Sequence, residues 1–144
     1  MQQLPGVCLV ESGYIGGKKP NPTYREVCKG DSGHIEAVRV LFDPIQTNYE
    51  AIIKLFLEIH DPTQKNGQGP DIGEQYQSAI FYYDQKQKDI SNKCLAFLKQ
   101  KGLSVVTNIL PVMTFWRAEE FHQNYYAQKG TEPYCHHRVE RFKD

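Results

Sequence analysis

The sequence predicts one domain of the α+β class, a two-layer sandwich in which helices cover one side of a mixed, mostly antiparallel sheet. Segments rich in β-branched residues alternate along the chain with segments whose apolar residues recur at helical spacing. The chain has 144 residues, 40% hydrophobic and 24% charged, the balance of a globular domain with a sizeable core. Two long turn-rich stretches, 18–32 and 62–73, interrupt the pattern, and ordered loops of this length often carry functional groups.

The charge and hydropathy of the chain argue against several classes of protein. Lysine plus arginine and aspartate plus glutamate each number 17, so neither a nucleic acid nor an anionic membrane is expected as a main partner. The apolar runs are too short to span a bilayer, and residues 1–5 lack the basic and apolar regions of a signal peptide. We therefore expect a cytoplasmic protein.

The first two elements are predicted to be strands. Val7–Ser12 is a short strand ended by Gly13, and His34–Phe42 is a strand rich in β-branched residues. Because side chains alternate along a strand, one face of the second strand carries His34, Glu36, Val38, Val40 and Phe42.

A helix follows, opened by the capping-box pattern Thr47-x-x-Glu50 and ended before Asp61-Pro62. Its apolar residues, which recur at helical spacing and should face the core, are Tyr49, Ile52, Ile53, Phe56 and Leu57.

The next strand and helix are joined by one capping residue. Ser78–Tyr83 is predicted to be a strand, and Asp84 caps a helix that runs to about Lys101, where Gly102 ends it. The residues of this helix expected to point inward are Ile90, Cys94, Phe97 and Leu98.

The remaining chain is predicted to hold a strand over Leu103–Leu110, ended by Pro111, and a short helix over Ala118–Tyr126. A tail over 128–144 completes the sequence.

Glu36 is the sharpest candidate for chemistry. A carboxylate on an apolar strand face is poorly solvated, which raises its pKa and allows the protonated acid to act as a proton donor near neutral pH. The alternative is that Glu36 lies at the strand end, facing water or pairing with an arginine.

Several loop residues could bind a polar ligand. Tyr14, Tyr24 and Tyr76 each lie in or beside a glycine- and proline-rich segment, where a phenolic hydroxyl can hold a ligand oxygen; plain packing is the alternative for each. Asp71 lies in a glycine-rich loop that lacks the nucleotide-binding motifs, so it is expected to organise the loop by accepting backbone hydrogen bonds.

The four cysteines are too few and too widely spaced for a disulfide scaffold. Cys94 faces the helix core and Cys8 lies in an apolar strand pattern, so both are predicted to be structural, whereas Cys28 could be either structural or reactive. Cys135 lies beside two histidines in the tail, a setting that suits thiol–disulfide exchange, although a plain surface cysteine would look the same.

A zinc-binding interaction protein is a weaker alternative, because structural zinc generally uses closely spaced ligand pairs and only one such pair occurs here. The side chains that could take part are Cys28, His34, His122, Cys135, His136 and His137. No cofactor and no metal are expected.

Taken in order, the motifs of the chain resemble those of the peptide methionine sulfoxide reductase A family. They are Gly13–Gly17 (GYIGG), Pro20–Cys28 (PNPTYREVC), Gly33–Val38 (GHIEAV), His60–Thr63 (HDPT), Gly69–Ile80 (GPDIGEQYQSAI), Ala118–Gln123 (AEEFHQ) and Tyr134–His136 (YCH). The resemblance covers nearly the whole chain from Leu4 onward, and it implies a ferredoxin-like core with long loops.

The resemblance also implies a reaction. In that family a cysteine thiolate attacks the sulfur of a methionine S-sulfoxide, in proteins or as the free amino acid; methionine leaves, and the enzyme keeps a sulfenic acid. A second cysteine converts this to a disulfide, which thioredoxin reduces.

Carried over position by position, the family's site residues fall on five residues of this chain. Glu36 would protonate the sulfoxide oxygen, Tyr24 and Tyr76 would hydrogen-bond it, Asp71 would support that network, and Cys135 would be the resolving cysteine.

The sequence departs from the family at its start. The family's nucleophile lies in a Gly-Cys-Phe-Trp segment upstream of the position of Leu4, with a first strand that is also missing here. We therefore interpret residues 1–144 as a single methionine sulfoxide reductase domain, monomeric if folded, that is incomplete at the N-terminus. We expect this chain to show no turnover of sulfoxide, and to have low solubility or marginal stability. It is either a truncated enzyme or a catalytically dead module that binds sulfoxide peptides.

Overall fold

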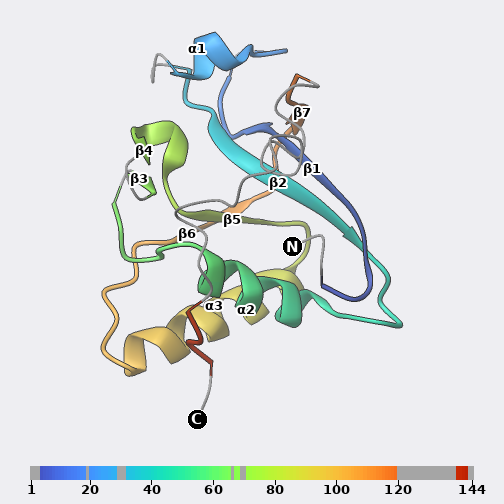
Figure 1. The fold of residues 1–144 in the computed structure, drawn as a ribbon, viewed down its shortest axis with the longest axis vertical. Helices are drawn as coiled ribbons and strands as arrows, with labels where there is room; N and C mark the ends of the chain where they lie inside the picture. Colours follow the sequence, from blue (N-terminus) through green and yellow to red (C-terminus); the bar gives the residue numbers. More distant parts are fainter. Residues whose placement is uncertain are drawn as a thin grey trace.

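The computed structural model of the protein describes residues 4–18, 20–28, 32–65, 67–68, 71–119 and 139–142. Its elements mix helices and strands as the sequence predicts (Figure 1). They are β1 (Val7–Ile15), α1 (Tyr24–Cys28), β2 (Ile35–Phe42), α2 (Tyr49–Ile59), β3 (Gly67–Gln68), β4 (Asp71–Ile72), the 3₁₀ helix η1 (Glu74–Tyr76), β5 (Ala79–Tyr82), α3 (Gln85–Gln100), β6 (Asn108–Pro111) and β7 (Trp116–Arg117).

The described strands form sheets of both kinds. One sheet has the order β2-β1-β7 with antiparallel pairs, and the short strands β3 and β4 are also antiparallel. Strands β5 and β6 run parallel. This arrangement confirms the predicted mixed, mostly antiparallel class, with α2 and α3 below the strands in the view of Figure 1.

Helices α2 and α3 pack together and against the β5–β6 pair to form the main core. All the inward positions predicted for the two helices are buried or half-buried, and all but Ile52 belong to this core. The Tyr49 hydroxyl lies 2.6 Å from Ser91 Oγ and joins the two helices. Burial raises the pKa values of Tyr49 and Cys94. The fully or nearly buried members of the core are Ile53, Leu57, Ile80, Cys94, Leu95 and Leu98.

One of the two predicted helix caps is wrong by one residue. Asn48, not Thr47, caps α2, because its Oδ1 accepts the Ala51 backbone N–H at 2.8 Å. The Thr47 N–H belongs instead to the preceding turn, where it donates to the carbonyl of Asp43. Asp84 caps α3 as predicted and accepts from the Gln87 N–H at 2.8 Å.

The segment 18–32 contains a helix that the sequence reasoning missed. The Thr23 hydroxyl accepts the Glu26 N–H at 3.2 Å, and the Glu26 carboxylate accepts the Thr23 N–H at 3.0 Å. This reciprocal pair is a capping box, and it opens α1. The pattern Thr23-x-x-Glu26 was present in the sequence and would have identified the helix.

Other boundaries also differ from the predictions. The strand predicted over 103–110 begins only at Asn108, since Val106 donates its N–H to the carbonyl of Pro62 rather than to a strand. Strand β7 was not predicted, and β3 and β4 lie within the predicted loop 62–73. Cys8, predicted to be structural, is exposed. The helix predicted over 118–126 lies, from residue 120 onward, outside the described residues.

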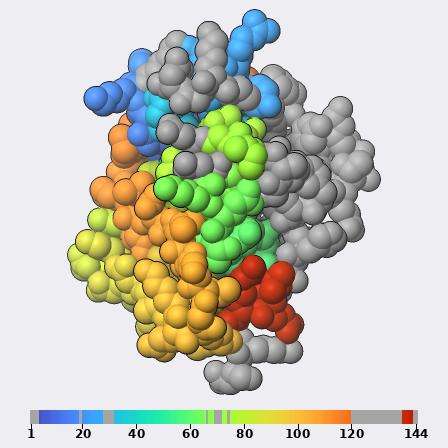
Figure 2. Space-filling view, turned by 90° about the vertical axis from the view of Figure 1, so that its left-hand side faces the viewer, coloured from blue at the N-terminus to red at the C-terminus, as the bar shows by residue number. Residues whose placement is uncertain are grey.

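The C-terminal residues 139–142 are held on the two helices. The Arg141 N–H donates to the buried Glu58 carboxylate at 2.9 Å, and the Phe142 ring stacks on Phe97 with centroids 5.4 Å apart. Figure 2 shows this segment, in red, against α2 and α3.

Candidate active site

Three predicted site residues lie on elements that meet at one end of the molecule. Glu36 is opposite Tyr14 in the β1–β2 ladder. Tyr24, the first residue of α1, packs against a small cluster that contains the same Tyr14. Tyr76 ends η1, which packs against β2. Figure 1 shows α1, η1 and the start of β2 together at the top of the view.

The surroundings of Glu36 are more open than the sequence predicted. Glu36 itself is half-buried, but Val38, two residues further along the same strand face, is 47% exposed. The β2 face is therefore only partly covered, and it supports a buried acid at Glu36 less than the alternating pattern suggested. The acid role of Glu36 stays a prediction.

The long loop that carries Tyr24 is closed at its base. His34, 2% exposed, accepts the Gly17 backbone N–H on Nδ1 at 3.1 Å. A β-carbon at Gly17 would lie 2.5 Å from the carbonyl oxygen of Ser32, so only glycine allows the two ends of the loop to approach this closely. The histidine considered as a zinc ligand thus closes a loop.

A strand from the distant part of the chain completes this end. Gly13 and Tyr14 of β1 pair with Arg117 and Trp116 of β7. The Ala118 N–H donates to the carbonyl of Ser12 at 2.9 Å, which extends the pairing beyond the strand.

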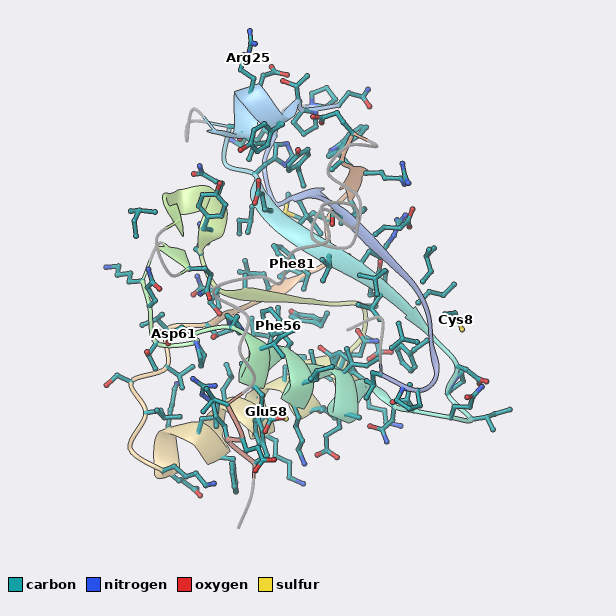
Figure 3. The ribbon with its side chains drawn as sticks, in the orientation of Figure 1. Cys8, Arg25, Phe56, Glu58, Asp61 and Phe81 are labelled. Atoms are coloured by element: carbon teal, nitrogen blue, oxygen red, sulfur yellow. The ribbon has the colours of Figure 1, made fainter. Side chains whose placement is uncertain are left out.

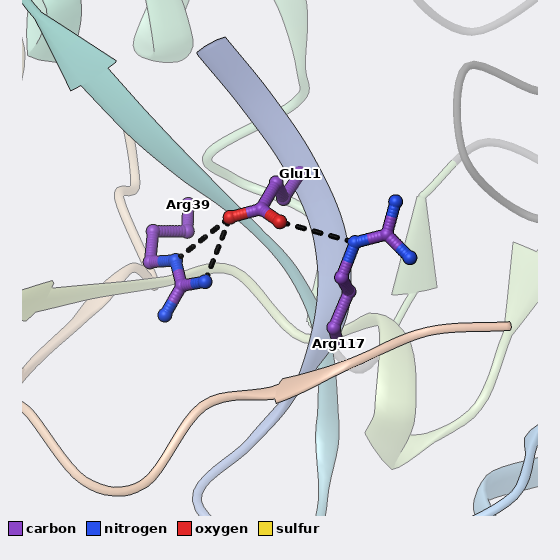
Figure 4. A network of polar contacts seen from close by, with 3 residues as sticks. All are labelled: Glu11, Arg39 and Arg117. Atoms are coloured by element: carbon purple, nitrogen blue, oxygen red, sulfur yellow. Dashed lines mark hydrogen bonds and ion pairs between the residues drawn. The ribbon is translucent and has the colours of Figure 1, made fainter. Parts of the chain in front are cut away.

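A charged network fastens the three strands from the side (Figure 4). Glu11 of β1 accepts from Arg39 Nη2 at 2.7 Å and from Arg117 Nε at 3.0 Å, so it links β2 and β7. The Arg39 guanidinium also lies 4.6 Å from the centre of the Phe115 ring. The hydrogen bond from Arg39, with Arg117 adding to it, holds the pKa of Glu11 below its usual value.

The side chain of Phe81 connects the sheet of β5 with the sheet of β1. Phe81 of β5 lies on the side of that strand that faces β2, whereas Phe56 of α2 lies on the opposite side (Figure 3). A β-carbon at Gly16 would be 3.5 Å from the Phe81 ring, so Phe81 reaches the end of β1.

Two predicted site residues are not placed. The backbone of Asp71 lies in β4, opposite Gln68, but its side chain is outside the described part of the chain. Cys135 also lies outside it, as do His122, His136 and His137 of the zinc alternative and the side chain of Cys28.

The described residues offer neither a metal-binding cluster nor a membrane-spanning helix. They contain no group of three or more histidine, cysteine, aspartate or glutamate side chains that could hold a metal ion. In the same residues, no helix has the length and apolar character needed to cross a bilayer.

Comparison with known proteins identifies the family. The family model described as peptide methionine sulfoxide reductase matches residues 1–144. The peptide methionine sulfoxide reductase MsrA of Nautilia profundicola is 45% identical over 134 residues, covering 93% of this chain and 78% of its own. That of Deinococcus radiodurans is 49% identical over 138 residues, covering 94% and 67%.

Solved structures agree with the sequence comparison. Mxr1 from Saccharomyces cerevisiae in reduced form matches with a TM-score of 0.85 and 29% identity, covering 94% of this chain and 80% of that one. Methionine sulfoxide reductase A of Corynebacterium diphtheriae matches with a TM-score of 0.79 and 36% identity, covering 94% and 70%. The fold and these matches thus define an α+β oxidoreductase that acts on a sulfur group. The chain belongs to the peptide methionine sulfoxide reductase family, whose chemistry is the reduction of methionine sulfoxide.

Proposed function

We propose that the end of the molecule formed by α1, η1 and the start of β2 binds the sulfoxide group of an oxidised methionine. The observation that supports this proposal is that Glu36 and Tyr24 both adjoin Tyr14, while η1 brings the Tyr76 segment against β2. Tyr24 and Tyr76 donate hydrogen bonds to the sulfoxide oxygen, and Glu36 supplies its proton.

The oxygen must leave as sulfur is reduced, and this sets the roles of the other groups. In a chain that carries the family's Gly-Cys-Phe-Trp segment, the thiolate of its cysteine attacks the sulfoxide sulfur. The oxygen is protonated and transferred to the thiol sulfur, and methionine is released beside a sulfenic acid. Cys135 then attacks the sulfenic sulfur, which releases water and leaves a disulfide. Asp71 supports the oxygen-binding hydrogen bonds.

The reaction needs an external reductant to regenerate the thiols. Thioredoxin reduces the disulfide; yeast Mxr1, whose fold this chain shares, has been solved in complex with Trx2. The substrates of this reaction are methionine-S-sulfoxide in proteins and as the free amino acid. Residues 1–144 form one monomeric domain that binds the sulfoxide in the cytoplasm.

A polypeptide of residues 1–144 binds sulfoxide without turning it over, because its sequence holds no Gly-Cys-Phe-Trp segment. Steady reduction of a methionine sulfoxide peptide with dithiothreitol, abolished by mutating one of the chain's four cysteines, would contradict this.

Calorimetry with a methionine sulfoxide peptide and the matching methionine peptide tests the binding site. We expect measurable affinity for the sulfoxide peptide and at least about fivefold weaker binding of the methionine peptide, which lacks the acceptor oxygen. Tyr24→Phe and Tyr76→Phe should each weaken sulfoxide binding about fivefold. Tyr83→Phe is the matched control, since Tyr83 is 64% exposed at the other end of β5. Equal affinity for the two peptides would refute the assigned site.

A further inference from the structure

We propose that Glu119 is a positioning residue for Tyr24: it fixes the tyrosine that binds the sulfoxide oxygen by accepting its backbone N–H. The inference rests on the proposed function of Tyr24. It assigns a role in that site to a residue 95 positions away in the sequence, for which neither charge nor spacing gave a signal.

The contact is a hydrogen bond from the Tyr24 N–H to Glu119 Oε2 at 3.3 Å. Tyr24 is the first residue of α1, and the first N–H groups of a helix have no acceptor within it. The Thr23 hydroxyl accepts the Glu26 N–H and the Thr23 carbonyl accepts the Val27 N–H. The Glu119 carboxylate therefore completes the cap that the capping box leaves open.

The position of Glu119 is set by residues that are themselves fastened to β1. Ala118 is 4% exposed, packs in the cluster of Tyr14 and Val27, and donates its N–H to Ser12. One residue earlier, Arg117 pairs with Gly13 and forms the ion pair with Glu11. A carboxylate carried on such a segment has little freedom to follow Tyr24 if α1 moves.

Helix α1, in contrast, has little stability of its own. It has five residues, far fewer than an isolated helix needs in water. It lies at the top of the molecule, where Arg25 points away from the strands (Figure 3). The loop around it is closed at the base by His34 and Gly17, Val27 is buried in the Tyr14 cluster, and the bond to Glu119 fixes the first residue of the helix.

Loss of the hydrogen bond between Glu119 and Tyr24 should affect only the region around Tyr24. Losing the bond should loosen Tyr24 and weaken sulfoxide binding while leaving the α2–α3 core intact, because peripheral segments open without global unfolding. A merely structural role of Glu119 would instead lower the stability of the whole chain.

The test is a double-mutant cycle on residues 1–144 with the sulfoxide peptide as the probe. The variants are Glu119→Ala, Glu119→Gln, Tyr24→Phe and the double variant Tyr24→Phe/Glu119→Ala. We expect Glu119→Ala to weaken binding about fivefold, the equivalent of one hydrogen bond, and Glu119→Gln, which keeps an acceptor oxygen, to stay within about twofold of the wild type. Glu119→Ala should have no further effect once the Tyr24 hydroxyl is gone. Glu50→Ala, in the first turn of α2, is the control carboxylate.

Amide hydrogen exchange at Tyr24 measures the same bond without the peptide. We expect exchange at least about tenfold faster in Glu119→Ala than in the wild type, with the exchange of the buried Leu98 amide unchanged. Unchanged exchange at Tyr24, unchanged affinity, or an equal loss of affinity with and without the Tyr24 hydroxyl would overturn the proposal. A wild-type chain that fails to distinguish the two peptides would refute the proposed function instead, and the exchange result would still decide whether Glu119 holds Tyr24.

Discussion

At Gly13, the single methyl group added by a Gly13→Ala substitution is expected to push β7 away from β1. A β-carbon there would lie 2.3 Å from Phe115 Cζ and 2.5 Å from the backbone carbonyl oxygen of Trp116. To reach an ordinary carbon–carbon contact, the Phe115 ring would have to retreat by roughly 1.2 Å. The ring can rotate away, but the Trp116 carbonyl belongs to the β1–β7 pairing, so relieving that contact moves the strand.

The magnitude follows from these two contacts. Overfilling a packed site costs about 1–3 kcal/mol, and moving β7 also weakens the Ala118 hydrogen bond to Ser12. We expect Gly13→Ala to lower the free energy of unfolding by about 2–3 kcal/mol, measured by urea denaturation. Sulfoxide binding should weaken as well, since β7 leads into the segment that carries Glu119.

A second variant separates the ring contact from the backbone contact. In Gly13→Ala/Phe115→Ala the ring is gone but the Trp116 carbonyl still blocks the new methyl group. The added cost of Gly13→Ala in this background should stay above about 1 kcal/mol. The reasoning would be refuted if removing the ring made Gly13→Ala harmless, or if Gly13→Ala alone cost less than about 0.5 kcal/mol.

Three other predictions concern the rest of the fold. Tyr49→Phe and Ser91→Ala should each cost about 1–2 kcal/mol in urea denaturation because each leaves a half-buried or buried hydroxyl unpaired; the double variant should cost less than the sum of the two, and strict additivity would argue against the bond. The lowered pKa of Glu11 means that its ion pairs contribute stability above the usual glutamate pKa of 4.5, and this stability is lost as the pH falls through the lower pKa of the folded state. Glu11→Gln should therefore flatten the acid limb of the stability–pH curve. An unchanged limb would show that the network contributes nothing. With Val38 and Leu41 exposed on β2, residues 1–144 alone should be marginally stable, and a cooperative thermal transition above about 50 °C would contradict that expectation.

Local sequence patterns predicted the helical layer well and the loop segments poorly. The periodicity of α2 and α3 identified their buried faces, because amphipathic spacing and Asp84 act within a few residues. The strand predicted over 103–110 is shorter than expected, because the backbone N–H of Val106 bonds to the carbonyl of Pro62, far away in sequence, and pairing with β5 begins only at Asn108. Likewise β7 has only two residues, too few for any alternating pattern, and exists because β1 supplies its partner.

The candidate site shows the same division. The motif order and strand alternation selected Glu36, Tyr24 and Tyr76, and their elements do lie together. The residues that hold this arrangement were not predictable from local pattern, since Glu119 meets Tyr24 and Glu11 meets Arg117 only after the chain has folded. The exposure of Val38 was also missed, because alternation predicts which side chains share a face but not whether another element covers it.

The most direct measurement compares sulfoxide reduction by two polypeptides: residues 1–144, and the same residues preceded by a family segment carrying Gly-Cys-Phe-Trp. With dithiothreitol as reductant, the extended chain should reduce a methionine sulfoxide peptide and the 144-residue chain should not. Glu36→Gln in the extended chain should lower the rate by about a hundredfold or more, the usual contribution of a general acid. An extended, folded chain with no reductase activity, or one whose rate does not depend on Glu36, would contradict the assignment of this site.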